Sequence, residues 1–185
     1  RHFDSNDYLS VEDCMTHLNN LPSDTQIQRT GPVVIADHAD NPGAGAYGDS
    51  TFLLKGLLAA GITNAAFGTL YDPDAVQQLI RAGVGAQVSL FIGGKTDPAF
   101  GPPLFVSGRI EALTDGQYRA TGPYARGALQ NLGPTAVLHV SGIDIIIATN
   151  CLQVTELETF SHAGIDPPSK AVLAIKSMQH FRAAF

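Results

Sequence analysis

Apolar and amphipathic segments alternate in the first half of the chain, and this alternation constrains the fold more than any other feature. Residues 33–36 are apolar on both faces, which is typical of a strand buried between helices. A helix is expected over 49–60, a second strand over 64–70 and a second helix over 72–81, each helix being followed by a glycine. This strand–helix–strand–helix order predicts a βαβ unit within a parallel sheet.

The pattern changes in the second half, where short strands and turn residues follow one another. Asp115-Gly116 and Ser141-Gly142 have the residue types of hairpin turns. Strands are expected over 86–92, 104–113, 117–121, 136–140, 143–148 and 171–176, and helices over 156–163 and from 179 onward. We therefore predict an α/β fold: a mixed, largely parallel sheet with flanking helices, opening with a βαβ unit and including antiparallel hairpins.

Residues 1–30 precede this pattern and are predicted to form an N-terminal helix and a linker. Ser10 suits the cap of the helix, and Glu12 and Asp13 suit its first turn, where the helix dipole favours acidic groups. Residues 23–30 are mostly polar, as in a linker. Residues 31–185 are then long enough for one α/β domain with a sizeable core.

Composition argues against several classes of function. The net charge is −6 at pH 7 without a cluster of Lys and Arg, so no nucleic-acid partner is expected. No apolar run approaches the ~20 residues that cross a bilayer, and no signal peptide follows Arg1, so no membrane partner is expected. Cys14 and Cys151 stand alone, without metal-ligand spacing. We expect a cytoplasmic protein with reduced thiols, and a homo-oligomer stays open.

Polar and glycine residues are densest over 37–51, between the first expected strand and the first expected helix. Open α/β sheets bind ligands at the carboxyl ends of strands and at free helix N–H groups. Gly43, Gly45 and Gly48 would let the backbone approach a ligand or turn through positive φ. The spacing matches neither the dinucleotide fingerprint nor the P-loop. The segment is therefore either a ligand site or a tight connection with Asx turns and a helix cap.

Other residues carry candidate chemistry nearby and at later strand ends. Asp37 and His38 are neighbours on an extended segment and point in opposite directions, so they are not expected to share a metal ion. Lys95 follows a glycine pair and either presents a cation to an anionic group or lies in a solvated turn. Lys176 and His180 could face one cleft, although a lone histidine near a helix start is more often structural. No nucleophile elbow or H-E-x-x-H pair is present.

Several motifs occur in a characteristic order across residues 31–185. They are Gly31-Pro32-Val33-Val34-Ile35-Ala36-Asp37, Asp40-Asn41-Pro42-Gly43, Gly45, Gly48-Asp49 and Thr51, Gly93-Gly94-Lys95-Thr96, Gly142-Ile143-Asp144-Ile145-Ile146 with Gln153, and Lys176-Ser177-Met178-Gln179-His180-Phe181. This set resembles the C-terminal domain of the MlrC (microcystinase C) family of zinc metallopeptidases. Ala44 and Tyr47 depart from the family pattern, which has a glycine and a smaller residue or proline there.

The resemblance implies a zinc-dependent hydrolase of amide bonds in linear peptides or related compounds. It places the zinc ligands mainly in a larger N-terminal domain that is absent from this chain, so we expect no metal ligand here and a chain cut at both ends relative to the family. Zinc would polarise the scissile carbonyl and lower the pKa of its bound water toward ~7. This chain would complete the cleft around a peptide-like substrate and would be inactive alone.

The resemblance also implies roles for single residues. Asn41 and His180 are the candidate catalytic residues, contacting the substrate or holding the tetrahedral oxyanion. Asp40 could orient a metal-binding histidine of the other domain, and Lys95 or Lys176 could receive a substrate carboxylate. The candidate substrate-binding residues are Asp37, His38, Asp40, Gly43, Gly45, Gly48, Asp49, Lys95, Thr96, Lys176 and Gln179.

A second hypothesis stays open, in which the chain is a non-catalytic α/β domain. It would bind a phosphate- or carboxylate-bearing small molecule at the glycine-rich segment and the helix N-terminus. The first hypothesis predicts an exposed apolar face near residues 37–48, where the N-terminal domain would pack. The second predicts anion binding without zinc and no large apolar patch.

Overall fold

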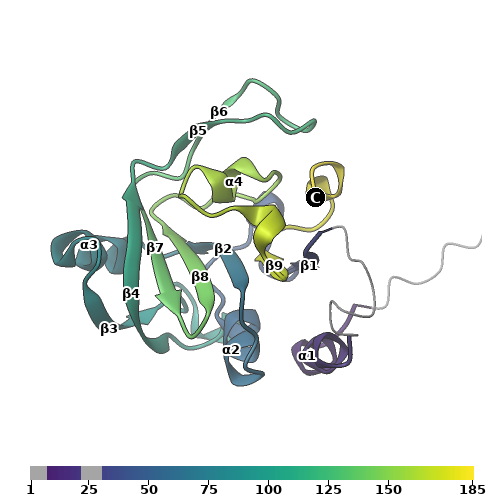
Figure 1. The fold of residues 1–185 in the computed structure, drawn as a ribbon, viewed down its shortest axis with the longest axis horizontal. Helices are drawn as coiled ribbons and strands as arrows, with labels where there is room; N and C mark the ends of the chain where they lie inside the picture. The colour runs from purple at the N-terminus through teal and green to yellow at the C-terminus, as the bar shows by residue number, and fades with distance from the viewer. Residues whose placement is uncertain (1–7, 22–30) are drawn as a thin grey trace, which may run out of the picture.

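The computed structural model describes residues 8–21 and 31–185, which form a large sheet, a separate hairpin and flanking helices (Figure 1). The strands of the large sheet are β1 (Val33–Ala36), β2 (Ala65–Tyr71), β3 (Gln87–Ile92), β4 (Leu104–Thr114), β7 (Thr135–Val140), β8 (Ile143–Ala148) and β9 (Val172–Ile175). The hairpin consists of β5 (Gln117–Arg119) and β6 (Leu129–Asn131). The helices are α1 (Val11–Asn19), α2 (Phe52–Ala59), α3 (Pro73–Ala82) and α4 (Glu158–Ser161).

The large sheet has the strand order β1-β9-β2-β8-β7-β4-β3. The pairs among β1, β9, β2 and β8 are parallel, and those among β8, β7, β4 and β3 are antiparallel. The predicted α/β fold with a mixed sheet is therefore confirmed. Its parallel half places four strand ends at one edge of the sheet, which is where the candidate site lies.

Both faces of the sheet are covered, which explains the apolar runs in the sequence. Phe67 on β2 packs in a core with α1, α2 and α3, whereas the neighbouring Ala66 packs against Phe160 of α4 and Phe181 on the other side. A strand with helices on both faces has no solvent side, so its residues are apolar without alternation.

Helix α3 begins and ends as its sequence predicts. The Asp72 carboxylate accepts a hydrogen bond from the amide of Ala75, and Pro73 occupies the first turn, where a missing N–H costs nothing. Gly83 follows the helix with a φ of 85°. The cap predicted for α1 is likewise confirmed, since the Ser10 hydroxyl accepts from the amide of Asp13.

The hairpin expected around Asp115-Gly116 is wrong in its pairing. Strand β4 continues along β7 as far as the pair Thr114–Thr135, so β5 has no place beside it. Gly116 has a φ of 71° and turns the chain away from the sheet, and β5 then pairs with β6. Residues 115–133 therefore form an arm outside the sheet, which Figure 1 shows above α4.

Three expected helices differ from the structure. Helix α2 begins at Phe52 instead of residue 49, because the preceding residues make contacts in the site described below. The helix expected over 156–163 is the four-residue α4, since the Glu156 side chain binds the arm. The last segment is a 3₁₀ turn, His180–Ala183. The linker predicted over 23–30 lies outside the described residues.

Helix α1 packs beside α2, and a glycine permits the close approach. A Cβ atom on Gly56 would lie 2.4 Å from Val11 Cγ1, much closer than two carbon atoms can approach. Met15 and Leu18 of α1 join the core on this side. Within the described residues, no helix is long and apolar enough to cross a membrane.

Candidate functional site

The site lies at the carboxyl ends of the parallel strands, together with residues 37–51, which we call the glycine-rich loop. Asp37 follows β1 and Lys176 follows β9, and the register pairs Ala36 with Ile175. The two side chains therefore leave the sheet at the same level, although 139 positions separate them. Open α/β sheets place ligands at this edge.

Lys176 is the centre of the arrangement, and its side chain is fully buried. Its Nζ atom donates to Asp40 Oδ2 at 2.6 Å, to Asp37 Oδ2 at 3.0 Å and to the Ser50 carbonyl oxygen at 2.9 Å. A buried ammonium group needs such partners, because an unpaired charge is costly to desolvate. Lys176 therefore joins β9, β1 and the glycine-rich loop.

Asp40 fixes the shape of the glycine-rich loop from inside. Its Oδ1 and Oδ2 atoms accept from the amides of Gly48 and Ser50, both at 2.8 Å. Gly45 and Gly48 have φ values of 88° and 73°, which favour glycine. Gly43 leaves room for the Gln153 side chain, since a Cβ atom at this position would lie 2.2 Å from Gln153 Oε1.

Two further aspartates organise the adjoining turn after β3. Asp49 Oδ2 accepts from the amides of Lys95 and Thr96 at 2.9 and 2.8 Å. Asp72 accepts from the Gly93 amide at 2.9 Å and from Lys95 Nζ at 2.8 Å. The end of β3 thus reaches the start of α3, and the charge of Lys95 is compensated within the chain.

Gln153 connects the glycine-rich loop to the segment after β9. Its Nε2 atom donates to Ser177 Oγ at 3.1 Å, and its Oε1 atom lies 3.3 Å from His180 Nδ1. The Tyr124 ring, from the arm, lies 4.4 Å from the His180 ring. Asn41 accepts from the Gly43 amide at 3.0 Å, so both candidate catalytic residues lie in segments that contact Gln153.

Cys151 lies beside the loop and is held as a neutral thiol. Burial raises its pKa, and the negative charges of Asp40 and Asp49 raise it further, while Lys176 acts in the opposite direction. Its Sγ atom donates to the Tyr47 carbonyl oxygen at 3.0 Å. A thiol with a raised pKa is a poor nucleophile near neutral pH, so Cys151 acts here as a packing group and hydrogen-bond donor.

Some of the candidate site residues predicted from the sequence lie together in the structure, and others lie apart. Asp37, Asp40 and Lys176 share one set of internal hydrogen bonds, and Asp49 and Lys95 belong to a second set beside it. His38 lies apart and stacks on Tyr8 with ring centroids 3.9 Å apart. Gln179 is exposed. Thr96 contacts Asp49 through its own backbone amide and not through its side chain.

Sequence reasoning missed Asp72 and Tyr124 as parts of the site. Asp72 was interpreted only as a helix start, yet one carboxylate both caps α3 and holds Lys95. The Asp-Pro pair signals the cap, but nothing local signals the second contact. Tyr124 reaches His180 through the course of the arm, which the sequence pattern does not give.

Comparison with known proteins decides the family. Residues 35–185 match the family model described as the MlrC C-terminus. The chain belongs to the MlrC C-terminal family. The resemblance drawn from the ordered motifs is thereby confirmed.

Two relatives place this MlrC C-terminal domain within longer proteins. It is 34% identical over 154 residues to Microcystinase C from a Sphingomonas species. The aligned residues cover 83% of this chain and 30% of that protein. A 2.13 Å crystal structure from Mesorhizobium sp. BNC1, of a protein named a metallopeptidase only provisionally, has a TM-score of 0.81 and 22% identity. That likeness, which shows the fold, covers 96% of this chain and 34% of the other. The chain thus spans about a third of the length of these relatives.

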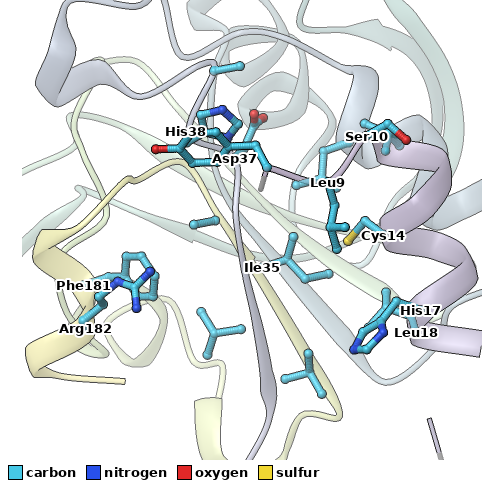
Figure 2. Close-up of a pocket in the computed structure, with 17 residues that line it drawn as sticks. Leu9, Ser10, Cys14, His17, Leu18, Ile35, Asp37, His38, Phe181 and Arg182 are labelled. Carbon is cyan, nitrogen blue, oxygen red and sulfur yellow. The ribbon is translucent and has the colours of Figure 1, made fainter. Parts of the chain in front are cut away.

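An apolar groove of about 650 Å³ runs along β1, at the edge of the MlrC C-terminal domain's sheet. Figure 2 shows Cys14, His17 and Leu18 on one side of β1 and Phe181 on the other, with Asp37 and His38 at one end. A second groove of about 840 Å³ lies between α1 and α2 and also reaches Asp37. Apolar surface is therefore exposed next to the glycine-rich loop.

The candidate metal-binding groups of the domain do not fit a metal site. Asp37 and Asp40 both bind Lys176, whose positive charge opposes a cation beside them. The His38 ring is stacked on Tyr8. Among residues 8–21 and 31–185, no three His, Cys, Asp or Glu side chains are grouped to hold an ion.

Proposed function

We propose that this chain is the substrate-binding and cleft-completing C-terminal domain of an MlrC-like zinc-dependent metallopeptidase, and that it is inactive alone. The longer protein would hydrolyse amide bonds of linear peptides or related compounds in the cytoplasm. One observation carries this proposal: the chain is an MlrC C-terminal domain that covers only 30% of Microcystinase C. The remaining length of such a protein is available for a metal-binding domain.

The metal is assigned to that other domain. The carboxylates of Asp37 and Asp40 are both paired with Lys176, so the described residues supply no suitable set of ligands. The exposed grooves beside β1 and α1 give the other domain an apolar surface to cover, next to the glycine-rich loop. This exposed apolar surface supports the two-domain hypothesis.

The residues of this chain would bind and orient the substrate. His180 and the Asn41–Gly43 segment, both in contact with Gln153, form the part of the site that substrate would reach. Asp40, Asp49 and Lys176 would also serve as internal supports that hold the loop in place. Such rigid support is what accurate positioning of a substrate needs.

The alternative, an anion site at the glycine-rich loop, has less support. In the glycine-rich loop and the adjoining turn, the amides of Gly48, Ser50, Lys95 and Thr96 are candidate donors to an anion, beside the N-terminus of α2. Each of these amides already donates to an internal carboxylate, Asp40 or Asp49. A phosphate would have to displace those carboxylates and would be repelled by them.

The test compares this chain with the longer protein that contains it, both purified without chelator. We expect about one zinc per molecule and hydrolysis of linear peptides from the longer protein, and neither from this chain. His180→Gln in the longer protein should lower kcat/KM at least tenfold. The control His139→Gln, at the end of β7 that lies away from the site, should leave kcat/KM unchanged. Stoichiometric zinc in this chain alone would refute the assignment of the metal to the other domain.

A further inference from the structure

A pocket of about 260 Å³ lies beside the site, between the glycine-rich loop and the arm. Pro42, Gly43 and Gln153 form its inner wall, and Tyr124 and Gln130 of the arm form its outer wall. Cys151, Leu152 and Thr155 complete the lining. Its volume is below the roughly 300–1,000 Å³ of pockets for whole ligands, so it suits one residue-sized group.

The arm is fixed in position over this pocket. Glu156 is buried, and its Oε2 atom accepts from the amides of Thr121 and Gly122 at 2.9 and 3.0 Å. These contacts hold the turn that carries Tyr124 onto His180. Gln130 lies opposite Tyr118 in the hairpin, and residues opposite one another point to the same face. Tyr118 bonds Thr159 of α4, so this face is turned toward the body of the domain.

The pocket lining is uncharged, although strong charges lie just behind it. Its residues include no acidic or basic side chain. Burial is the main cause of the raised pKa of Cys151 in this wall, and the charges of Asp40 and Asp49 add to it while Lys176 opposes them. An anion would meet the charges of the two aspartates, and a cation would be desolvated without a counter-ion. The electrostatics therefore favour a neutral group.

Hydrogen-bond capacity in the pocket matches an amide. Within the described residues, neither the Gln130 carboxamide nor the Thr155 hydroxyl donates a hydrogen bond to the chain, and Thr155 is only 9% exposed. Gln153 is oriented by Ser177 and His180 and keeps one further N–H donor. Donors and acceptors of this kind complement the C=O and N–H of one amide.

We propose that this pocket binds a neutral amide group of the substrate, either a peptide unit or a carboxamide side chain, with Tyr124 as the residue that closes it and limits its size. The proposal deepens the proposed function, since it takes the ligand to be part of a peptide. The pocket belongs to this chain alone, however, so binding can be measured without zinc or catalysis. Its failure is thus distinguishable from failure of the metallopeptidase assignment.

The experiment titrates the 185-residue chain with N-acetyl-glutamine amide, glutarate and inorganic phosphate, followed by ¹H–¹⁵N NMR. We expect the glutamine amide to shift the side-chain amide signals of Gln130 and Gln153, and to bind at least tenfold more tightly than the other two probes. Thr155→Val and Gln130→Leu should each weaken binding by roughly three- to tenfold, the effect of one hydrogen bond. The matched controls Thr63→Val and Gln87→Leu should have no effect.

Each other outcome would overturn the proposal. Equal or tighter binding of glutarate or phosphate would mean that the pocket prefers anions. Absence of binding by the glutamine amide would mean that the pocket is no independent subsite. Tyr124→Ala adds a second readout: it should let a bulkier amide, N-acetyl-tryptophan amide, bind more tightly than in the parent chain, and Phe91→Ala on β3 should not.

Discussion

At the scale of single residues, Lys176 shows how one buried charge determines the shape of a site. Its ammonium group has three oxygen partners along the glycine-rich loop, and two of them are carboxylates. Lys176→Met would leave Asp37 and Asp40 without their cation, so we expect a loss of roughly 3–5 kcal/mol in the free energy of unfolding. Urea denaturation measures this. Lys55→Met, on the exposed side of α2, is the control, and equal losses in both variants would contradict this role.

Asp144, on β8, gives the domain a predictable response to acid. Burial alone would raise its pKa, but hydrogen bonds from Lys170 and His139 at 2.6 Å outweigh burial and lower it. Because the folded pKa is below the unfolded value of about 3.9, the carboxylate stabilises the fold above that pH, and its contribution disappears as the pH falls through the folded pKa. Asp144→Asn should therefore be less stable than the parent at pH 7, and the difference should shrink below about pH 4. A pH series of thermal unfolding checks this, and a difference that grows toward low pH would contradict it.

At the scale of elements, the close packing of α1 on α2 can be tested directly. By helix propensity alone, Gly56→Ala would stabilise α2 by about 1 kcal/mol. The new methyl group would instead collide with Val11, so we expect a net loss of about 1–3 kcal/mol and faster hydrogen exchange in α1. Val11→Ala in the same chain removes the obstacle and should recover most of the loss. Additive effects of the two substitutions would show that the helices do not meet there.

The elements also show what the sequence could and could not predict. Strand β2 and helix α3 were predicted because burial on two faces, an Asp-Pro cap and a final glycine are all local signals. The arm was paired wrongly because strand pairing depends on β7, which lies far along the chain. Helix α4 was predicted too long because the Glu156 side chain is used by the arm, a tertiary contact that propensity does not include.

The same distinction applies to the site. Its location was predictable, because strand ends, glycines and ordered motifs mark it in the sequence. The contacts within the site were not predictable: Asp40 and Lys176 bind each other in the structure, and their expected contacts with substrate stay a prediction. Opposite charges at distant positions carry no sign of their pairing until the strand order is known. Local signals thus locate the site, and topology determines which of its polar groups remain available.

At the scale of the whole molecule, the apolar grooves suggest where the rest of a longer MlrC-like protein would pack. Leu9 lines the groove beside β1 and is 57% exposed, while Leu129 on the arm is 61% exposed and lies outside that groove. If the other domain covers the groove, hydroxyl-radical footprinting should label both leucines in this chain but only Leu129 strongly in the longer protein. The two residues share chemistry and exposure, so their ratio isolates the effect of docking. An unchanged ratio would place the domain interface elsewhere, and protection of Leu129 alone would move it to the arm.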